Sequence, residues 1–194
     1  AGKINREQSL YFNRAYQSTE RLIYLVEDLL KAAKIENEVM EIESRKININ
    51  NLIKDVMSDF RKKADDKKIK LIFSNSEKEF SVRGDYKYTK YVISNLVDNA
   101  IKYTRKGKVK ISLGKNKDYI EIKIADTGIG ISQNQLDNIF KKFYRVQNSE
   151  SVKAGGTGLG LFIVKNLIEK QNGLIEVKSN LGKGSTFLIK MPIK

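Results

Sequence analysis

The sequence predicts an α+β fold, a two-layer α/β sandwich in which a mixed sheet is backed by three helices and preceded by one long helix. The long helix follows from residues 5–37, which contain neither Pro nor Gly. Strands are expected where apolar and polar residues alternate, and helices where apolar residues recur at three- and four-residue steps. After residue 45 both patterns occur, with several strands and three helices that are not in strict alternation. That order favours a sheet covered by helices on one side.

Composition narrows the classes of protein. The chain has 194 residues, 40% of them hydrophobic, so it can bury a core. It contains no cysteine, which excludes a disulfide scaffold and a thiol nucleophile, and no histidine, which removes the commonest general base. No apolar run reaches the roughly 18 residues of a membrane span, so we expect a soluble, cytoplasmic fragment.

The net charge of +14 raises the question of nucleic acid. Lys far outnumbers Arg, the basic residues are spread along the whole chain, and no long basic run stands out. Clusters such as Arg61-Lys62-Lys63 and Lys141-Lys142 fall in helical stretches, where we interpret them as solvated faces. We therefore expect no nucleic-acid partner.

The helix over residues 5–37 carries a heptad seam, which consists of Phe12, Ala15, Thr19, Leu22, Val26, Leu29 and Ala33. About 32 helical residues span nearly 50 Å at 1.5 Å per residue, more than one small domain covers. The helix is therefore predicted to pack with partner helices. A polar hinge follows, so the domains are predicted as residues 1–44 and 45–194. The alternative is a helix that packs entirely on its own domain.

The second domain is predicted as a succession of short elements. The expected strands cover residues 46–49, 69–73, 80–83, 108–113, 119–125, 174–179 and 185–191. The expected helices begin at a cap on Asn50 or Asn51, at a cap on Asp85 and near residue 159. One further short helix is expected near residues 133–140, and residues 147–156 are predicted to be a mobile polar segment.

One helix carries a polar row beside its apolar stripe. Asn95, Asn99, Lys102 and Tyr103 recur at steps of four, three and four, so they share one face. An amide oxygen can ligate Mg²⁺, and a lysine can meet a phosphate. A solvated helix face would give the same pattern, so the row alone decides nothing.

Three glycine-containing segments follow in order. Asp126-Thr127-Gly128-Ile129-Gly130 comes directly after a strand, where the carboxylate can accept from an exocyclic amine; a plain turn is the alternative. Gly155-Gly156-Thr157-Gly158-Leu159-Gly160-Leu161 opens a helix and offers backbone N–H groups to a phosphate, unless it is only a flexible loop. Gly182-Lys183-Gly184-Ser185-Thr186 is a turn into the last strand.

Together these segments resemble the N, G1, G2 and C-terminal glycine motifs of the sensor histidine kinases, whose catalytic domain has the Bergerat-type ATP-binding fold. Residues 139–146 are similar to that family's F motif, so the resemblance extends over residues 46–192. It implies ATP and Mg²⁺ as ligands and an ATP–protein histidine phosphotransferase as the activity.

The resemblance also implies roles for single residues. The metal would be held by Asn99, with Asn95 beside it. Phosphates would meet Lys102, Arg145 and the segment that includes Gly156, Thr157, Gly158, Leu159 and Gly160. The base and sugar would meet Tyr103, Asp126, Gly128, Gly130 and Thr186. Phe140 and Phe143 would be hydrophobic anchors of the lid, the segment that closes over the bound nucleotide in this family.

Asn95 separates branches of this group. Relatives that hydrolyse ATP carry a glutamate there, whereas an amide cannot accept a proton at neutral pH. Transfer to another acceptor is therefore favoured over hydrolysis. Two alternatives remain open, a serine kinase of the anti-sigma type and a nucleotide-sensing scaffold without transfer activity.

The N-terminal helix resembles the second helix of the kinases' dimerisation and phosphotransfer domain. The first helix, which carries the family's acceptor histidine, is absent from this sequence. We expect a trimmed piece that does not autophosphorylate alone; the alternative is a protein that naturally lacks the acceptor. The expected partners are a histidine-containing dimerisation helix, a response regulator and, in the full-length protein, a second copy in a homodimer. The parent protein is expected to be a membrane-anchored sensor or a soluble one.

Overall fold

The computed structural model describes residues 4–74, 78–146 and 156–193. The chain divides into two compact units, Ala1–Met40 and Glu41–Lys194. Among the described residues, no helix combines the length and apolar character needed to cross a bilayer.

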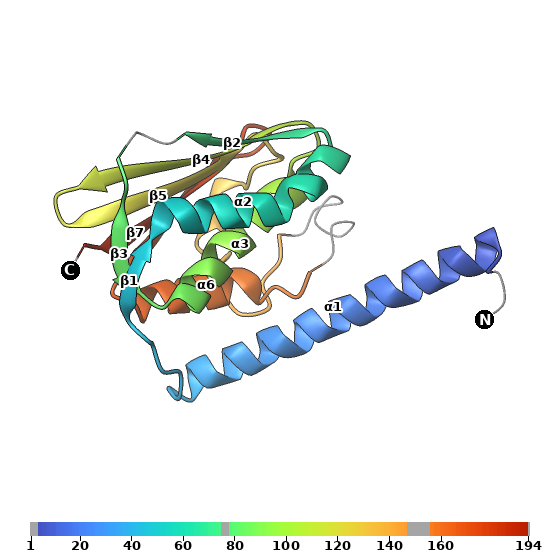
Figure 1. The fold of residues 1–194 in the computed structure, drawn as a ribbon, viewed down its shortest axis with the longest axis horizontal. Helices are drawn as coiled ribbons and strands as arrows, with labels where there is room; N and C mark the ends of the chain where they lie inside the picture. The colour runs from blue at the N-terminus through green and yellow to red at the C-terminus, as the bar shows by residue number, and fades with distance from the viewer. Residues whose placement is uncertain (1–3, 75–77, 147–155, 194) are drawn as a thin grey trace. The chain divides into compact units, whose positions relative to one another are not determined.

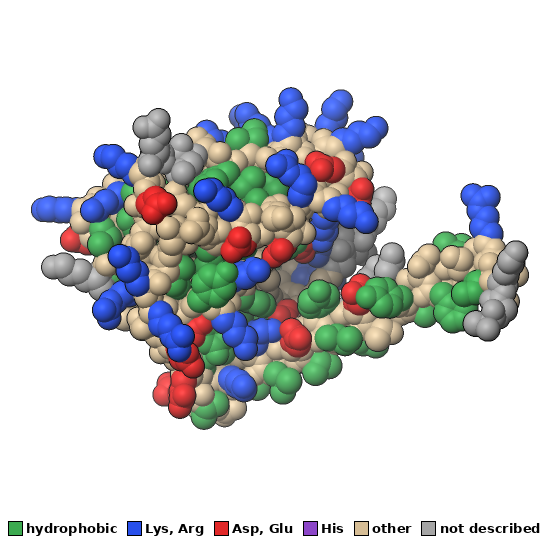
Figure 2. All heavy atoms as spheres, viewed as in Figure 1, with side chains coloured by type: hydrophobic (Ala, Val, Ile, Leu, Met, Phe, Trp, Pro, Cys, Tyr) green, Lys and Arg blue, Asp and Glu red, His purple; other side chains and the backbone are tan. Residues whose placement is uncertain are grey.

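The first unit is the helix α1 (Arg6–Glu36), as the sequence predicts. It begins at a capping box, because Asn5 Oδ1 accepts from the Gln8 backbone N–H and the Gln8 side chain accepts from the Asn5 N–H. Its seam residues Phe12, Leu22 and Val26 are 63%, 60% and 52% exposed. Figure 2 shows apolar side chains along this helix.

The second unit contains a five-stranded mixed sheet in the order β2-β4-β5-β7-β6. Its strands are β2 (Ile69–Ser74), β4 (Gly107–Asn116), β5 (Tyr119–Asp126), β6 (Leu174–Asn180) and β7 (Gly184–Pro192). β2 and β4 are parallel, and the other neighbours are antiparallel. A separate pair, β1 (Arg45–Asn48) and β3 (Ser81–Gly84), is antiparallel.

Three helices cover one face of this sheet (Figure 1), which confirms the predicted two-layer fold. They are α2 (Ile49–Asp66), α3 (Tyr86–Tyr103) and α6 (Gly160–Glu169). Every residue of the predicted apolar stripe on α3 is buried, namely Val92, Ile93, Leu96, Val97, Ala100 and Ile101. The stripe faces the sheet and leaves the polar row of α3 outside the core.

Some predicted boundaries are wrong. The cap of α2 is Asn48, whose side chain accepts from the Asn51 N–H at 3.1 Å. Asn50 is buried instead, because its Oδ1 accepts from Phe80 N at 2.8 Å and its Nδ2 donates to Lys78 O at 3.2 Å. The short helix α4 (Gln133–Leu136) ends four residues earlier than predicted. The β4–β5 turn is also shorter, since β4 continues to Asn116 and β5 begins at Tyr119.

Candidate functional site

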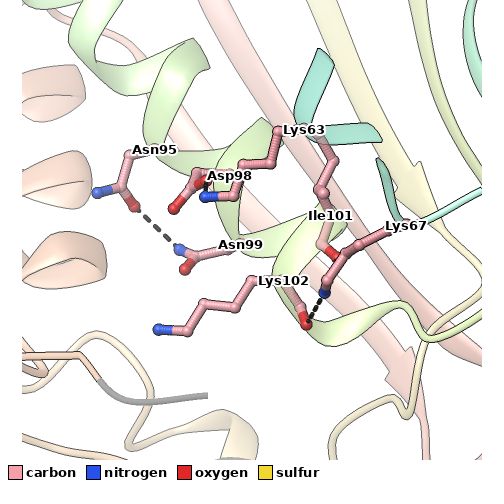
Figure 3. Close-up of polar contacts among 7 residues, drawn as sticks. All are labelled: Lys63, Lys67, Asn95, Asp98, Asn99, Ile101 and Lys102. Carbon is pink, nitrogen blue, oxygen red and sulfur yellow. Dashed lines mark hydrogen bonds and ion pairs between the residues drawn. The ribbon is translucent and has the colours of Figure 1, made fainter. Parts of the chain in front are cut away.

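The site begins on α3, whose row of Asn95, Asn99, Lys102 and Tyr103 is partly exposed. Asn99 Nδ2 donates to Asn95 Oδ1 at 3.0 Å, and this hydrogen bond fixes both amide planes. Figure 3 shows the Asn99 oxygen turned away from Asn95 and the Lys102 side chain extending along the same side of α3. The row therefore presents an oxygen ligand and an ammonium group together.

Lys102 lies in positively charged surroundings. Burial lowers the pKa of Lys102, and the charges of Arg145, Lys63 and Lys67 lower this pKa further, while Asp98 raises it. The ammonium also lies 5.3 Å from the centroid of the Tyr103 ring. An anion bound here would offset the repulsion among these cations.

The glycine-rich segment before α6 lies directly against this row. A Cβ on Gly156 would be 2.9 Å from Lys102 Nζ, and a Cβ on Gly160 would be 2.6 Å from Asn95 Nδ2. Leu159 N–H donates to Thr157 Oγ1 at 3.1 Å. The Leu159 side chain is fully buried, so only the backbone of Leu159 can meet a ligand.

Asp126 ends β5 at the other side of the site. Its Oδ1 accepts from Gly128 N at 2.8 Å and from Ser185 N at 3.2 Å. Burial raises the pKa of Asp126, while these two N–H groups lower it. Both backbone donors meet Oδ1, so Oδ1 is held by the protein backbone.

Tyr103, at the end of α3, contacts the segment that follows Asp126. Its carbonyl oxygen accepts from Ile129 N at 3.2 Å, and a Cβ on Gly128 would lie 2.5 Å from that oxygen. Thr186 of β7 pairs with Ala125 of β5, next to Asp126. Gly130 has a φ of +67° and passes so close to Asn180 O that a Cβ would lie 2.0 Å from it. A side chain at Gly128 or Gly130 would thus displace backbone.

The segment after α4 contacts the site through its backbone. A Cβ on Gly158 would lie 2.7 Å from the Phe143 carbonyl carbon, and Phe143 itself has a φ of +61°. The Phe143 side chain is 58% exposed, so the expectation that it is a hydrophobic anchor is wrong. Phe140 is half-buried, and Arg145 is close enough to affect the pKa of Lys102 and Tyr103. The predicted mobile segment 147–156 lies outside the described residues, except for Gly156.

Lys63 of α2 and the C-cap residue Lys67 reach α3, which was not predicted. Lys63 forms an ion pair with Asp98, although its cluster was interpreted as a solvated face. Lys67 Nζ donates to Ile101 O and Lys102 O, both at 2.9 Å. Figure 3 shows these contacts beside the polar row.

The polar atoms fit a magnesium nucleotide. Among the described residues there is no group of three or more His, Cys, Asp or Glu side chains that could hold a metal ion. Asn99 Oδ1 is an oxygen that could ligate Mg²⁺ together with oxygens of a bound phosphate. One surface hollow of the described chain is lined by residues that include Arg61, Asp65 and Lys68, and none of the site residues lines it.

Known proteins resemble this chain in sequence and in fold. Residues 84–194 match the family described as histidine kinase-, DNA gyrase B-, and HSP90-like ATPase. The sensor histidine kinase RppB of Synechocystis sp. is 39% identical, over 98% of this chain and 43% of its own length. The chain thus spans less than half of that relative.

Two solved structures show the same architecture. Full-length ShkA in complex with AMPPNP superposes with a TM-score of 0.84 and 26% identity, over 98% of this chain and 40% of that one. Histidine kinase ThkA in complex with the response regulator protein TrrA superposes with a TM-score of 0.77 and 25% identity, over 100% of this chain and 53% of that one.

Proposed function

Because this chain belongs to the histidine kinase-, DNA gyrase B- and HSP90-like ATPase family, we propose that residues 45–194 bind Mg-ATP and transfer its γ-phosphate to a histidine outside this sequence. The phosphoryl group would then pass to an aspartate of a response regulator. One observation carries this proposal. The Asn95–Asn99 amide pair, Lys102 and the glycines before α6 meet at one end of a site whose other end is Asp126.

Asp126 would select adenine. Its Oδ2 would accept from the exocyclic amine, while Gly128 N and Ser185 N hold Oδ1 in place. Gly128 and Gly130 would let the ring approach the backbone, and Tyr103 and Thr186 would line the base and sugar. Guanine offers a carbonyl oxygen where adenine has its amine, so a carboxylate there rejects guanine.

The triphosphate would extend from Tyr103 toward the start of α6. Lys102 and Arg145 would neutralise its charge, and the backbone from Gly156 to Gly160, with Thr157, Gly158 and Leu159, would donate N–H groups. Mg²⁺ would bind Asn99 Oδ1, whose orientation is fixed by the hydrogen bond to Asn95. When bound, the metal would polarise the phosphate oxygens.

Transfer is favoured over hydrolysis because no described side chain beside the proposed phosphate position can act as a general base. Asn95 is a neutral amide, and Asp98 forms an ion pair with Lys63. Positioning and charge neutralisation do most of the work in phosphoryl transfer, and Lys102 and Arg145 supply both. A histidine imidazole brought to the γ-phosphate is itself the nucleophile and needs no base from this chain.

The partners follow from α1 and from the relatives. The exposed seam that includes Phe12, Leu22 and Val26 is suited to a helical bundle with a histidine-containing helix and with a second copy of the chain. The ThkA–TrrA complex supports a response regulator as the next acceptor. We place this unit in the cytoplasm, where ATP is available.

The test is labelling with γ-³²P-ATP and Mg²⁺. Incubated alone, the chain should stay unlabelled, because it contains no histidine. A separate helical domain that contains the family's histidine should become labelled when the chain is added, weakly because the tether is lost. The label should be acid-labile. Acid-stable label on the chain alone would instead indicate a serine kinase, and ATP binding without transfer would indicate a sensing scaffold.

A further inference from the structure

Three side chains of α2 and the side chain of its C-cap residue, spaced four residues apart, meet α3 along its length. Tyr86 Oη donates to Asp55 Oδ2 at 3.4 Å, and Lys90 Nζ lies 3.1 Å from Asp59 Oδ2. Further along, Lys63 forms its ion pair with Asp98. Lys67 then binds the carbonyl oxygens of residues 101 and 102. The residue numbers rise together on both helices, so α2 and α3 are parallel.

Parallel neighbouring helices place their negative C-terminal ends side by side. The last carbonyls of a helix have no partner within the helix, and two such ends repel each other. Lys67, the C-cap of α2, donates to Ile101 O and Lys102 O of α3. The side chain of a residue at the end of α2 thus binds the last carbonyls of α3. Burial lowers the pKa of Lys67, and Lys63 lowers it further, which fits an ammonium group partly withdrawn from water.

We propose that Lys67 is a positioning residue of the nucleotide site and acts through Lys102. This inference rests on the proposed function. The bond from Lys67 to Lys102 O holds the backbone of the residue whose Nζ would lie 2.9 Å from a Cβ on Gly156. Tyr103 is held separately, by Ile129 N. Loss of Lys67 would therefore free the last turn of α3 mainly at Lys102.

A purely structural role predicts something different. A lysine that only caps a helix lowers stability when removed, and its effect on ATP affinity does not depend on Lys102. A positioning residue loses its effect once Lys102 is gone, because interacting residues are not additive. A double-mutant cycle on ATP affinity separates the two roles.

The experiment measures Kd for Mg-ATP by calorimetry and the free energy of unfolding in urea, on the whole chain. Lys67→Met should raise Kd about tenfold, the scale of one charge-assisted hydrogen bond. Lys62→Met, which removes the same charge from the exposed face of α2, should change it less than about twofold. Lys67→Arg, which keeps donors for both carbonyls, should restore most of the affinity.

In the Lys102→Met background, Lys67→Met should change Kd by less than about twofold. The same loss in both backgrounds, or unchanged affinity in a folded Lys67→Met protein, would overturn the proposal. Should Lys67→Met not fold, Lys67→Gln, which keeps one neutral donor, takes its place in the same cycle. Failure of the unaltered chain to bind Mg-ATP would contradict the proposed function itself, a result distinct from any outcome of the cycle.

Discussion

Asp126→Asn is the substitution that most sharply tests base recognition. In the structure Oδ1 accepts from Gly128 N and Ser185 N. The Asn side chain keeps those two bonds only if its oxygen occupies the Oδ1 position, which places its NH₂ group where Oδ2 was. That group is a donor facing the donor amine of adenine. A flipped amide would instead set NH₂ against two backbone N–H groups, so neither orientation restores the site.

The loss is that of a hydrogen bond to a charged group, about 1–3 kcal/mol, or about 5- to 150-fold in Kd. Titration calorimetry with ATP and GTP measures it. Asp118→Asn is the matched control, because it removes an equal charge from the turn before β5, at the end away from Asp126. ATP affinity unchanged by Asp126→Asn, or GTP bound as tightly as ATP by the unaltered chain, would refute the assignment.

Three further outcomes are expected. Asn99→Ala should make the Kd for ATP equal in Mg²⁺ and in chelator. The control Asn166→Ala removes an amide that is bonded to Phe162 O of its own helix, and it should keep the difference in Kd between Mg²⁺ and chelator. If Asn99→Ala weakens ATP binding by the same factor in Mg²⁺ and in chelator, Asn99 is not the metal ligand. Gly184→Ala should lower the free energy of unfolding by about 1–3 kcal/mol more than Gly182→Ala. Both glycines have positive φ, but only at Gly184 does a Cβ meet backbone, 2.0 Å from Asp126 O; equal losses would contradict this. Because burial raises the pKa of Asp126, the folded state holds its proton more tightly than the unfolded chain. The free energy of unfolding of the unaltered chain, relative to that of Asp126→Asn, should therefore fall as pH rises through that pKa. Urea titrations across the acid range measure this, and a relative stability that rises with pH would contradict the raised pKa.

Periodicity predicted the parts of the fold that burial dictates. The stripe on α3 is buried as a helix against a sheet requires, and Asp85 caps that helix as expected. Caps chosen by tertiary contacts were less predictable. Asn50 is withdrawn into the core by Lys78 and Phe80, which leaves Asn48 as the cap of α2, and no local signal distinguishes these asparagines.

The polar row of α3 could be predicted because it shares one helix face, but its contacts could not. The approach of Gly156 to Lys102, like that of Gly160 to Asn95, depends on a long connection whose path the sequence does not fix. The family resemblance implied that Phe143 is a hydrophobic anchor, yet its backbone makes the contact with Gly158 and Phe143 is 58% exposed.

One feature of the sequence indicates the face of α2 that makes contacts. Asp55, Asp59, Lys63 and Lys67 lie four residues apart, with acids first and lysines last, as the helix dipole favours. That spacing marks one face of a helix but does not say which helix it meets. The parallel packing on α3 is a property of the fold, so only the structure connects Lys67 to the site.

The most direct measurement is a crystal structure of this chain with Mg²⁺ and a non-hydrolysable ATP analogue. We expect the adenine amine about 3 Å from Asp126 Oδ2. We also expect Mg²⁺ about 2.1 Å from Asn99 Oδ1, and the phosphates between Lys102 and the start of α6. An analogue bound with its base away from Asp126, or with its phosphates away from the backbone before α6, would contradict the proposed site.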